Sequence, residues 1–443
     1  MLEHGKAGRG WWTLLAVLFL VALTVRGAAA WAFRHHPLGG DEIEYDALAR
    51  GMVETGRYTR QPGFSTMLYS AEPGAPTSFR PPGWPFVLAG LYRIFGEAPM
   101  PARLALAVWN AAGCVLLVLL LTRLSFDRRA ALAAGLVWAL WPASVWYPGT
   151  RSTTLSTESL AIPVLFLALL ALAHVGKGHA ATPLAAGVLF GCCALVRSNF
   201  SLLIPLAAAW ILLETEGARP PRLQRAALLV LGGALVVCPW MLRNRTLLGS
   251  FTIATQREPI FLGNNAWARG SYDSEFFNDL NSAQVAWIRA RYDQFEKRSE
   301  VEKGRIYTQE AITYAREHPV RQAWLVARRA LLFLSPLREK EDADNLFDWA
   351  FAPVGVLCLI GGAWAVKANP RSTSLLALPV LATFFTCLLV LFLPRYRYPA
   401  EPMLIAFACL GVSEGIARHG APVMLGLLGL LLAASVGLAV VMG

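Results

Sequence analysis

Eleven long apolar stretches recur along this 443-residue chain, and they limit its fold more than any other feature. They are residues 11–31, 102–122, 130–147, 159–175, 181–197, 200–214, 226–242, 347–366, 374–393, 400–416 and 422–442. About 20 helical residues cross the hydrocarbon core of a bilayer. Only 16% of the residues are charged, whereas soluble domains carry about 25%. The sequence therefore predicts an all-α polytopic membrane protein with about 11 transmembrane helices.

The distribution of positive charge predicts which way the chain crosses the membrane. The net charge is +11, but no nucleic-acid-binding motif accompanies it, so we expect no nucleic-acid partner. Lysine and arginine concentrate in one alternating set of short connections between the predicted spans. The opposite set carries only four arginines: Arg151, Arg197, Arg395 and Arg397. Because cytoplasmic loops are rich in positive charge, we expect the N-terminus in the cytoplasm and the opposite set outside.

This topology places two long polar segments together on the external face of a single membrane domain, residues 1–443. The first external loop is 32–101, and the second, 243–346, is helical by composition and is expected to lie over the membrane face. Residues 318–336 alternate arginines with large apolar residues, which is typical of an interfacial amphipathic helix. The apolar stretch 81–96 begins with a proline pair and is short, so we expect a re-entrant or interfacial helix there.

An acidic cluster follows the first span directly, in "GGDEIEYDALARGMVETGRYT" (39–59). Asp41 and Glu44 have the spacing of a capping box, and acidic residues favour the positive end of a helix dipole. Alternatively, Asp41 is a catalytic carboxylate held at the membrane surface, on the helix face that it shares with Glu44 and Tyr45. The two interpretations do not exclude each other, and the local sequence leaves both open.

Other charged residues of the predicted external side allow a structural and a functional interpretation as well. Arg80, in "SFRPPGWPF", is either a snorkelling side chain or a phosphate ligand. Arg395 and Arg397, in "FLPRYRYPAEPM", either anchor an aromatic belt or bind an anion such as a lipid phosphate. Glu158, at the mouth of the span 159–175, is either a helix cap or a functional carboxylate.

The sequence gives little support for a metal or a disulfide. His35 and His36 are adjacent in a predicted loop, which is weak evidence for a metal site. The seven cysteines all lie in apolar stretches without the spacing of metal ligands, so we interpret them as small buried residues.

Six segments, in order, resemble landmarks of the GT-C glycosyltransferases, specifically the bacterial relatives of protein mannosyltransferases and of lipid A aminoarabinose transferases. The acidic segment after the first span is one of them. The others are "FRPPGWPFVLAGLYRIFG", "STESLAIPVLFLALLAL", "PWMLRNRTLLGSF", "LGNNAWARG" and "RYRYPAEPMLIAFA". The resemblance covers nearly the whole chain and implies the GT-C fold, with external juxtamembrane helices.

The resemblance also implies an activity and roles for particular residues. It implies a bacterial plasma-membrane enzyme that moves a sugar from a polyprenyl-phosphate-linked donor to a hydroxyl of a glycan, lipid or protein on the external, periplasmic side. Asp41 and Glu158 would be the catalytic carboxylates, and Arg80, Arg395 and Arg397 would bind the lipid phosphate. Further substrate-binding residues are expected at five positions: Glu42, Glu44, Tyr45, Asn264 and Asn265.

Two features qualify this expectation. Aminoarabinose transferases carry a lysine in the proline motif where this chain has Arg80, which weakens a prediction of that particular sugar. A divalent metal bridging Asp41 and Glu158 is compatible with the pattern but not required by it.

A membrane transporter or lipid flippase is the alternative class. It would place charged residues near the middle of its spans and would break its helices there. Most charged residues of this chain lie on one side of the membrane in the predicted topology, which favours the glycosyltransferase.

Overall fold

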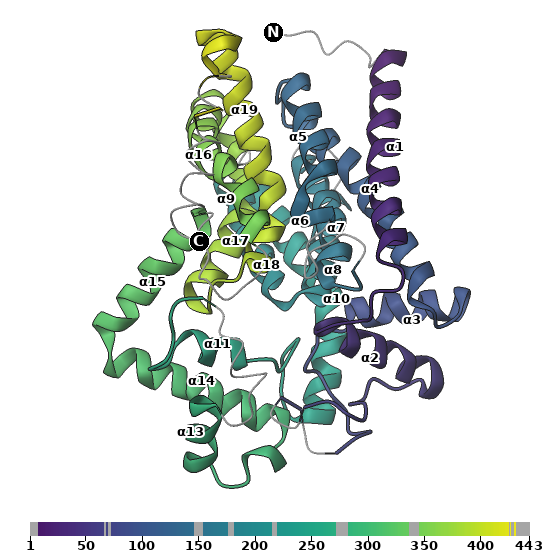
Figure 1. The fold of residues 1–443 in the computed structure, drawn as a ribbon, viewed down its shortest axis with the longest axis vertical. Helices are drawn as coiled ribbons and strands as arrows, with labels where there is room; N and C mark the ends of the chain where they lie inside the picture. The colour runs from purple at the N-terminus through teal and green to yellow at the C-terminus, as the bar shows by residue number, and fades with distance from the viewer. Residues whose placement is uncertain are drawn as a thin grey trace.

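The computed structural model describes residues 8–65, 68–69, 72–145, 154–175, 181–214, 219–271, 282–335, 345–424, 426 and 429–430. Every regular element in these ranges is a helix. Most of the longer helices run roughly along the long axis of the molecule and form a bundle (Figure 1). The bundle helices are α1 (Arg9–Ala32), α4 (Pro99–Arg123), α5 (Arg128–Leu140), α6 (Pro142–Val145), α7 (Thr157–Ala173), α8 (Ala181–Val196), α9 (Leu203–Glu214), α10 (Arg219–Leu248), α16 (Asn345–Ala368), α17 (Pro370–Leu389) and α19 (Glu401–His419).

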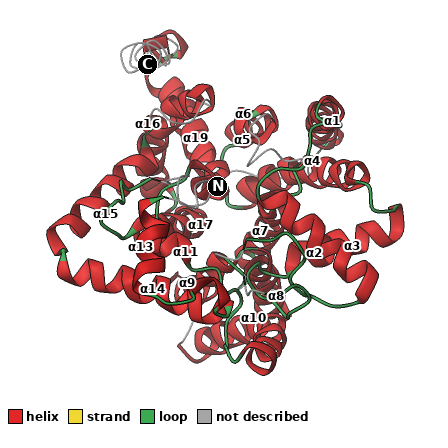
Figure 2. Cartoon of the chain, turned by 60° about the horizontal axis from the view of Figure 1, so that its bottom comes forward, coloured by secondary structure: helices red, strands yellow, loops and turns green. Residues whose placement is uncertain are grey.

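The remaining helices gather at one end of the bundle, the lower end in Figure 1, which we call the polar end. They are α2 (Asp41–Thr55), α3 (Gly83–Phe95), α11 (Glu258–Gly263), α13 (Ala283–Arg291), α14 (Glu300–Glu317) and α15 (Pro319–Leu334). Seen from this end, α2 and α3 lie on one side, α13, α14 and α15 on the other, and α11 between them (Figure 2). Short connecting helices complete the chain: α18 (Pro394–Arg397), η1 (Ser198–Leu202), η2 (Phe295–Lys297) and η3 (Tyr398–Ala400).

The lengths of the bundle helices agree with a polytopic membrane protein. In the part of the chain that the structure describes, six helices are long and apolar enough to cross a bilayer. They are Arg9–Ala32, Pro99–Arg123, Pro221–Leu248, Phe351–Ala368, Pro370–Leu389 and Pro394–His419. Three apolar helices are shorter: Thr157–Ala173, Ala181–Val196 and Ser198–Leu213. The predicted helical membrane fold is thus confirmed, whereas the count of about 11 spans is not, and the predicted span 422–442 lies largely outside the described residues.

The predicted span 130–147 is two helices rather than one. Helix α5 ends before Pro142, and α6 begins at this proline, because a proline ring has no N–H to continue the helical hydrogen bonds. The buried Arg26 of α1 satisfies carbonyl groups that the break leaves open, donating to Ala139 O at 2.9 Å and to Trp138 O at 3.3 Å. This cation, in the last third of α1, therefore has structural partners within the bundle.

The apolar stretch 81–96 forms only the 13-residue helix α3, as expected for a segment that does not span. Helix α3 packs on α2, and both lie across the direction of the bundle (Figure 1). Ile94 and Phe95 are exposed, so α3 presents apolar side chains away from the protein. This is the pattern of a helix that lies in a membrane interface.

Small residues allow α8 and α10 to pack backbone against backbone. A Cβ added at Gly187 would overlap the carbonyl of Leu229, and one at Gly232 would overlap the carbonyl of Leu184. Small residues at such contacts are typical of helix packing in membranes.

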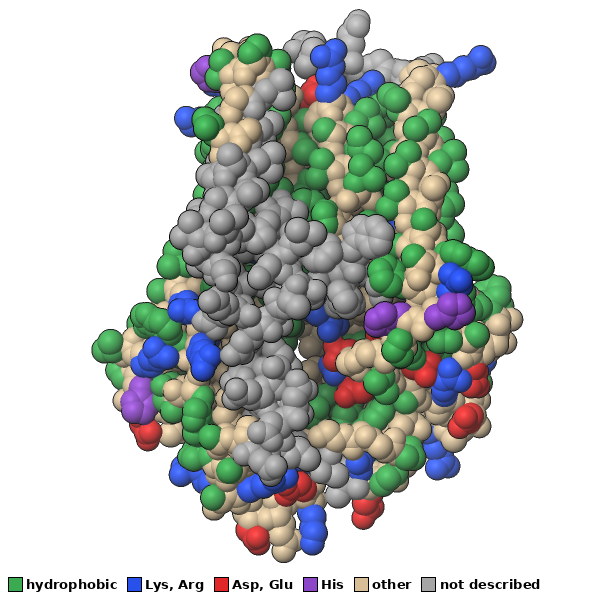
Figure 3. Space-filling model, viewed as in Figure 1, with side chains coloured by type: hydrophobic (Ala, Val, Ile, Leu, Met, Phe, Trp, Pro, Cys, Tyr) green, Lys and Arg blue, Asp and Glu red, His purple; other side chains and the backbone are tan. Residues whose placement is uncertain are grey.

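Charged and apolar side chains separate along the long axis. On the described part of the flank that faces the viewer many side chains are apolar, and charged ones gather at the polar end and at the opposite rim (Figure 3). At that rim, Arg128 lies 5.2 Å from the Trp11 ring and Arg418 lies 5.1 Å from the Trp364 ring. These arginines belong to the connections that the sequence predicts to be rich in positive charge.

A second, smaller apolar core stabilises the polar end. Its buried residues come from α11, α13, η2, α14 and the segment after α17: Phe261, Leu262, Val285, Ile288, Phe295, Ile306, Tyr307 and Leu391. The described residues of this segment, 243–271 and 282–335, thus pack on one another and on the end of the bundle, and they support the residues described next.

Candidate functional site

The acidic cluster 41–44 forms the first turn of α2, but Asp41 does not cap this helix. Helix α2 begins at Asp41, with Gly40 before it at a φ of 51°. Its neighbour Glu42 accepts, through Oε2, the backbone N–H of Gly39 just before the helix at 3.3 Å. The capping box suggested for Asp41 and Glu44 is wrong, and the carboxylate of Asp41 is available for other partners.

Two arginines from distant parts of the chain hold Asp41. Arg80 Nη2 donates to Asp41 Oδ1 at 2.7 Å, and Arg395 Nη1 donates to Asp41 Oδ2 at 2.6 Å. Arg80 also donates through Nε to Glu44 Oε2 at 2.5 Å. The hydroxyl of Tyr69 donates to the same Glu44 oxygen at 2.9 Å. Arg80 and Arg395 thus bind the two oxygens of one carboxylate, Asp41, and we call these three residues the clamp.

Arg395 reaches a second carboxylate deeper in the protein. Its Nε donates to Glu158 Oε1 at 2.5 Å, and its Nη2 donates to Glu158 Oε2 at 3.1 Å. Arg197, just after α8, also pairs with Glu158 and donates to the hydroxyl of Thr157 at 3.1 Å. Glu158 has no exposed side-chain surface, so its charge is balanced entirely by these arginines.

Together these residues form a continuous run of alternating charges, which we call the charge chain. Its members, in order of contact, are Glu44, Arg80, Asp41, Arg395, Glu158 and Arg197. The Asp41 side chain keeps 29% of its surface exposed and Arg395 keeps 19%, whereas Glu158 keeps none. The charge chain therefore opens to solvent at Asp41 and runs inward to Glu158. In Figure 3, acidic and basic side chains border a hollow below the apolar flank of the bundle.

The arginines fix the charge of Asp41. Burial alone would raise its pKa, but the nearby Arg80 and Arg395 outweigh this effect and hold the pKa well below its usual value. Asp41 is therefore ionised at neutral pH. A carboxylate stabilised in this way is also a weaker base than an ordinary one, which matters for any proton transfer.

The loop that carries Arg80 is anchored by a buried carboxylate of α14. Glu300 accepts hydrogen bonds from the hydroxyl of Thr77 at 2.6 Å, from the N–H of Ser78 at 2.7 Å and from the hydroxyl of Thr255 at 2.9 Å. The N–H of Thr255 donates to the Ser78 carbonyl at 2.9 Å. Helix α14 thus fixes the backbone two residues before Arg80.

Two of the predicted substrate-binding residues on α2 lie beside the charge chain. Tyr45 is buried, and the Arg80 guanidinium lies 5.6 Å from the centre of its ring. Glu42 accepts the backbone N–H of Leu155 at 2.9 Å, which ties α2 to the segment before α7. Tyr45 thus lies beside Arg80 of the clamp, and Glu42 anchors the helix that carries Asp41.

Asn264 and Asn265 are buried, and their contacts are structural. Asn264 donates to the Ile260 carbonyl at 2.7 Å and accepts from Gln322 Nε2 at 2.7 Å. Asn265 donates to the Phe261 carbonyl at 2.9 Å. The two amides close the end of α11 and join it to neighbouring elements, and among the described residues these hydrogen bonds do not reach the charge chain.

Arg397 is also separate from the charge chain, although it stands two residues after Arg395. It is 2% exposed, donates to Glu401 Oε1 at 3.0 Å and to the Ser335 carbonyl at 3.1 Å, and stacks 3.6 Å from the Phe351 ring. Glu401 in turn accepts from Trp141 Nε1 at 2.7 Å. These contacts bind the start of α19 to its neighbours.

The position expected for a bridging metal is filled by a guanidinium. The described residues contain no group of three or more His, Cys, Asp or Glu side chains placed to hold a metal ion. Arg395 lies directly between the carboxylates of Asp41 and Glu158. A divalent cation shared by these two residues would have to displace it.

Several residues of the site were not predicted as site residues. In the sequence, Arg197 is one of the four arginines in the connections that carry little positive charge. This position indicates that it needs an anionic partner. Tyr69 and Gln256 carry no local pattern that marks them. Gln256 accepts from Arg80 Nη1 at 3.2 Å, a contact that only the tertiary fold creates.

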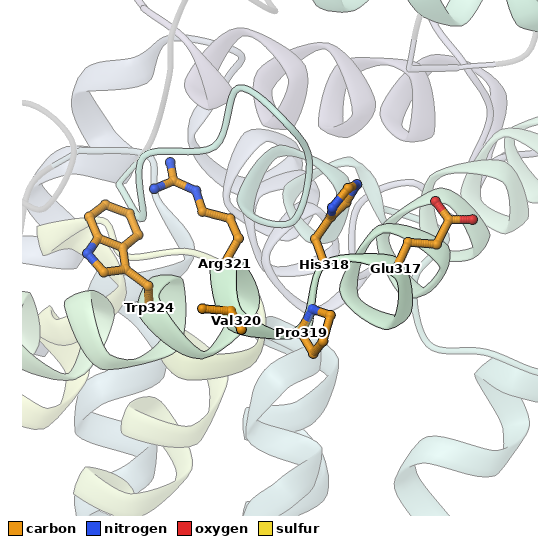
Figure 4. Close-up of a pocket in the computed structure, with 6 residues that line it drawn as sticks. All are labelled: Glu317, His318, Pro319, Val320, Arg321 and Trp324. Atoms are coloured by element: carbon orange, nitrogen blue, oxygen red, sulfur yellow. The ribbon is translucent and has the colours of Figure 1, made fainter.

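An open hollow of about 550 Å³ lies elsewhere, at the turn between α14 and α15. Its lining residues are Glu317, His318, Pro319, Val320, Arg321 and Trp324 (Figure 4). Arg321 lies 4.1 Å from the Trp324 ring. The hollow shares no residue with the charge chain, so we do not assign it to the same site.

Comparison with protein families gives a match over part of the chain. Residues 79–242 match the family model of dolichyl-phosphate-mannose-protein mannosyltransferases. The matched region begins one residue before Arg80 and includes Glu158 and Arg197. No curated protein sequence matches the chain.

Solved structures show the same fold. An archaeal oligosaccharyltransferase, AglB from Archaeoglobus fulgidus in complex with an inhibitory peptide and a dolichol-phosphate, aligns with a TM-score of 0.56 at 16% identity, over 98% of this chain and 55% of that one. An apo form of the Archaeoglobus fulgidus oligosaccharyltransferase aligns with a TM-score of 0.58 at 15% identity, with the same coverage of both chains. This chain thus spans about half the length of those proteins.

A further likeness is weaker. ArnT from Cupriavidus metallidurans bound to undecaprenyl phosphate aligns with a TM-score of 0.43 at 15% identity, over 93% of this chain and 80% of that one. The two archaeal structures suffice to confirm the GT-C fold that the sequence resemblance implies. The family match covers residues 79–242 only, and the likeness to the archaeal structures shows the fold.

Proposed function

We propose that this chain, which has the GT-C fold, is a membrane glycosyltransferase that takes a sugar from a polyprenyl-phosphate-linked donor and transfers it to a hydroxyl group. The observation that carries the proposal is the clamp of Arg80 and Arg395 around the partly exposed Asp41. A reaction of this kind needs a proton acceptor for the hydroxyl and cations for the departing phosphate. The open end of the charge chain offers both within hydrogen-bonding distance of each other.

Arg80 and Arg395 are the proposed ligands of the donor phosphate. Guanidinium groups bind phosphate oxygens through two parallel hydrogen bonds, a geometry that a lysine does not provide. In the present structure the anion between them is Asp41. The archaeal oligosaccharyltransferase that shares this fold was solved with a dolichol-phosphate, which is a lipid phosphate of the proposed chemical class.

Asp41 is the proposed proton acceptor. The acceptor hydroxyl oxygen forms a bond to the anomeric carbon while the bond from that carbon to the phosphate oxygen breaks. The bonding electrons leave with the polyprenyl phosphate, and the hydroxyl proton passes to a carboxylate oxygen of Asp41. Arg80 and Arg395 stabilise the negative charge that develops on the departing phosphate.

The resting geometry couples these two roles. Asp41 is a weak base while both arginines bind it, because they hold its pKa low. A donor phosphate that shares Arg80 and Arg395 weakens their hold on Asp41, and the pKa of Asp41 then rises. Asp41 would therefore gain basicity only after the donor is bound, which limits unproductive chemistry on water.

Burial changes the role that we propose for Glu158. It has no exposed side-chain surface, so it orients Arg395 and does not touch the substrate. Glu44 orients Arg80 in the same way through its 2.5 Å contact. Tyr45 and Glu42 are proposed to support the clamp, whereas the contacts of Arg397, Asn264 and Asn265 favour structural roles for those residues.

The sidedness of the site is part of the proposal. The charge chain lies at the polar end, and the arginine-rich connections lie at the opposite rim. Because positive loops favour the cytoplasm, we propose that the site faces the external side of a bacterial plasma membrane. The acceptor hydroxyl then belongs to a glycan, a lipid or a protein of the cell envelope.

Envelope chemistry in cells with and without the protein tests the proposed function. We expect cells without it to lose one sugar substituent from envelope glycans, lipids or proteins, and to accumulate the lipid-linked donor. The wild-type chain restores the substituent, and so does Glu310→Gln, a matched acidic change outside the charge chain, whereas Asp41→Asn does not. Identical envelopes and donor levels with and without the protein would contradict the proposal.

A further inference from the structure

The Arg80 guanidinium has a third partner, which is neutral. Besides Asp41 and Glu44, Arg80 donates through Nη1 to Gln256 Oε1 at 3.2 Å. The other end of the Gln256 amide donates through Nε2 to Glu258 Oε1 at 2.7 Å. One amide thus links Arg80 to a third carboxylate at the polar end, which the sequence analysis did not single out.

The contact with Glu258 decides which end of this amide faces Arg80. A carboxylate accepts hydrogen bonds and an amide nitrogen only donates them, so Glu258 holds the nitrogen and the oxygen points to Arg80. The reversed amide would direct N–H groups at a guanidinium, which cannot accept a hydrogen bond. Glu258 therefore fixes the orientation in which Gln256 supports Arg80.

Glu258 is the first residue of α11 and is 2% exposed. Burial raises its pKa to about 7, although the contact with Gln256 and the charge of Arg80 both oppose that rise. The charged and titratable groups that face it are Arg80, Glu44 from α2, Tyr307 from α14 and Tyr396 from α18, together with its neighbour Arg257. The carboxyl group thus changes charge in the neutral pH range.

We propose that Glu258 is a positioning residue of the donor site, which orients Arg80 through Gln256 and tunes how strongly Arg80 attracts the donor phosphate. This inference rests on the proposed function, because it assumes that Arg80 binds that phosphate. Glu258 is too buried to touch the substrate and acts through Gln256 and through its charge. Asp41 stays ionised beside its two arginines, whereas the charge of Glu258 varies in the neutral pH range.

The charge of Glu258 determines in which direction the donor affinity changes with pH. Below pH 7 Glu258 is largely neutral, and Arg80 is offset by two carboxylates. Above pH 7 a third negative charge lies one amide away, and the attraction of Arg80 for an anion falls. Donor affinity should therefore decrease as the pH rises through 7.

A lipid phosphodiester is the appropriate probe, because a phosphate monoester itself titrates near pH 6. Farnesyl methyl phosphate carries one fixed negative charge over the neutral range. We expect its affinity for the wild type to fall about three- to tenfold between pH 6 and pH 8, as one nearby charge is added. Glu258→Gln, which is nearly isosteric and neutral at every pH, should bind with the low-pH affinity throughout.

Glu310→Gln is the matched control, since Glu310 lies on α14 and pairs with Arg291 and Tyr292 away from Arg80. It should keep the wild-type pH dependence. Equal wild-type affinity at pH 6 and pH 8, or an undiminished pH dependence in Glu258→Gln, would overturn the role of Glu258 alone. Absence of binding by the wild type at every pH would instead overturn the proposed function, and this inference with it.

Thermal unfolding without ligand supplies a second measurement on the same proteins. The pKa of Glu258 is higher in the folded state, about 7, than in the unfolded state, so the folded state binds more protons between those values. Stability then decreases as the pH rises from 5 to 7. We expect a fall in Tm over this range that is smaller in Glu258→Gln, and an identical fall in both proteins would contradict the proposal.

Discussion

Arg395 and Arg397 stand in one short motif, two residues apart, yet they serve different parts of the molecule. Arg395 is partly exposed and joins the carboxylates of Asp41 and Glu158. Arg397 is buried, pairs with Glu401 and stacks on the Phe351 ring. One arginine faces the opening at the polar end, and the other fixes the start of α19.

The difference teaches how a functional cation can be told from a structural one in this bundle. A buried ion pair whose members are fully enclosed holds elements together but cannot meet a ligand. The charge chain instead contains a carboxylate, Asp41, with 29% of its side chain exposed. A substrate phosphate can compete for arginines there, and it cannot do so around Glu401.

Replacement of Asp41 should give the largest effect. Asparagine keeps the size of the side chain but cannot accept the proton, and general-base catalysis contributes about 10²–10⁴-fold. We expect Asp41→Asn to lose sugar transfer by this factor, while Arg395 remains paired with Glu158 and the protein stays inserted. The measurement is turnover with the lipid-linked donor, together with Tm. Turnover equal to that of the wild type would mean that Asp41 has a purely structural role.

Replacement of Arg397 should affect stability instead. Breaking a fully buried ion pair from one side costs about 3–5 kcal/mol, because Glu401 would keep its charge without the guanidinium that balances it. We expect Arg397→Gln to lower the Tm strongly and to leave the donor affinity of the folded fraction unchanged. A stable variant with weakened donor binding would place Arg397 in the donor site after all.

The sequence alone was sufficient to predict most of the helices and part of the candidate site. Nine of the predicted spans correspond to apolar helices, because length and hydrophobicity determine them locally. The break before Pro142 and the clamp were not predicted, since both depend on distant partners. Arg395 meets Asp41 across 354 positions of the chain, and no local pattern encodes such a pairing.

The same limit explains the residues whose proposed roles changed. Arg397, Asn264 and Asn265 have the residue types expected at a polar site, and only their burial and partners reveal structural contacts. Gln256 and Glu258 have no distinctive spacing, so they emerge only when the loop 251–258 is folded against Arg80. Residue type predicts which chemistry is available, and packing decides which side chains reach the opening.

Replacement of Glu300 tests how firmly the Arg80 side of the clamp is held. A glutamine keeps one carbonyl oxygen but presents N–H groups to donors that now lack an acceptor, and unsatisfied buried groups cost about 1–3 kcal/mol. We expect Glu300→Gln to lower stability by this amount and to weaken donor binding, because the backbone at Thr77 and Ser78 is released. Donor affinity equal to that of the wild type would show that Arg80 does not depend on α14.

Removal of the Tyr69 hydroxyl should give the smallest effect. Tyr69→Phe deletes one hydrogen bond to Glu44, and a typical hydrogen bond contributes about 0.5–1.5 kcal/mol. Arg80 remains on Glu44, so we expect a loss of donor affinity of up to about tenfold and near-normal insertion. A loss as large as that of Asp41→Asn would mean that Tyr69 takes part in the reaction itself.

The affinity of a polyprenyl phosphate for Arg395→Gln and Arg397→Gln, measured side by side with Tm, tests the central claim most directly. In Arg395→Gln, Glu158 keeps Arg197 and Asp41 keeps Arg80, so the loss of stability should be the smaller of the two. We predict that Arg395→Gln weakens lipid-phosphate binding at least about tenfold, the loss of one charge-assisted contact, and that Arg397→Gln leaves it within about twofold. Equal affinities in the two variants, or a larger loss in Arg397→Gln, would contradict the assignment of the charge chain as the donor site.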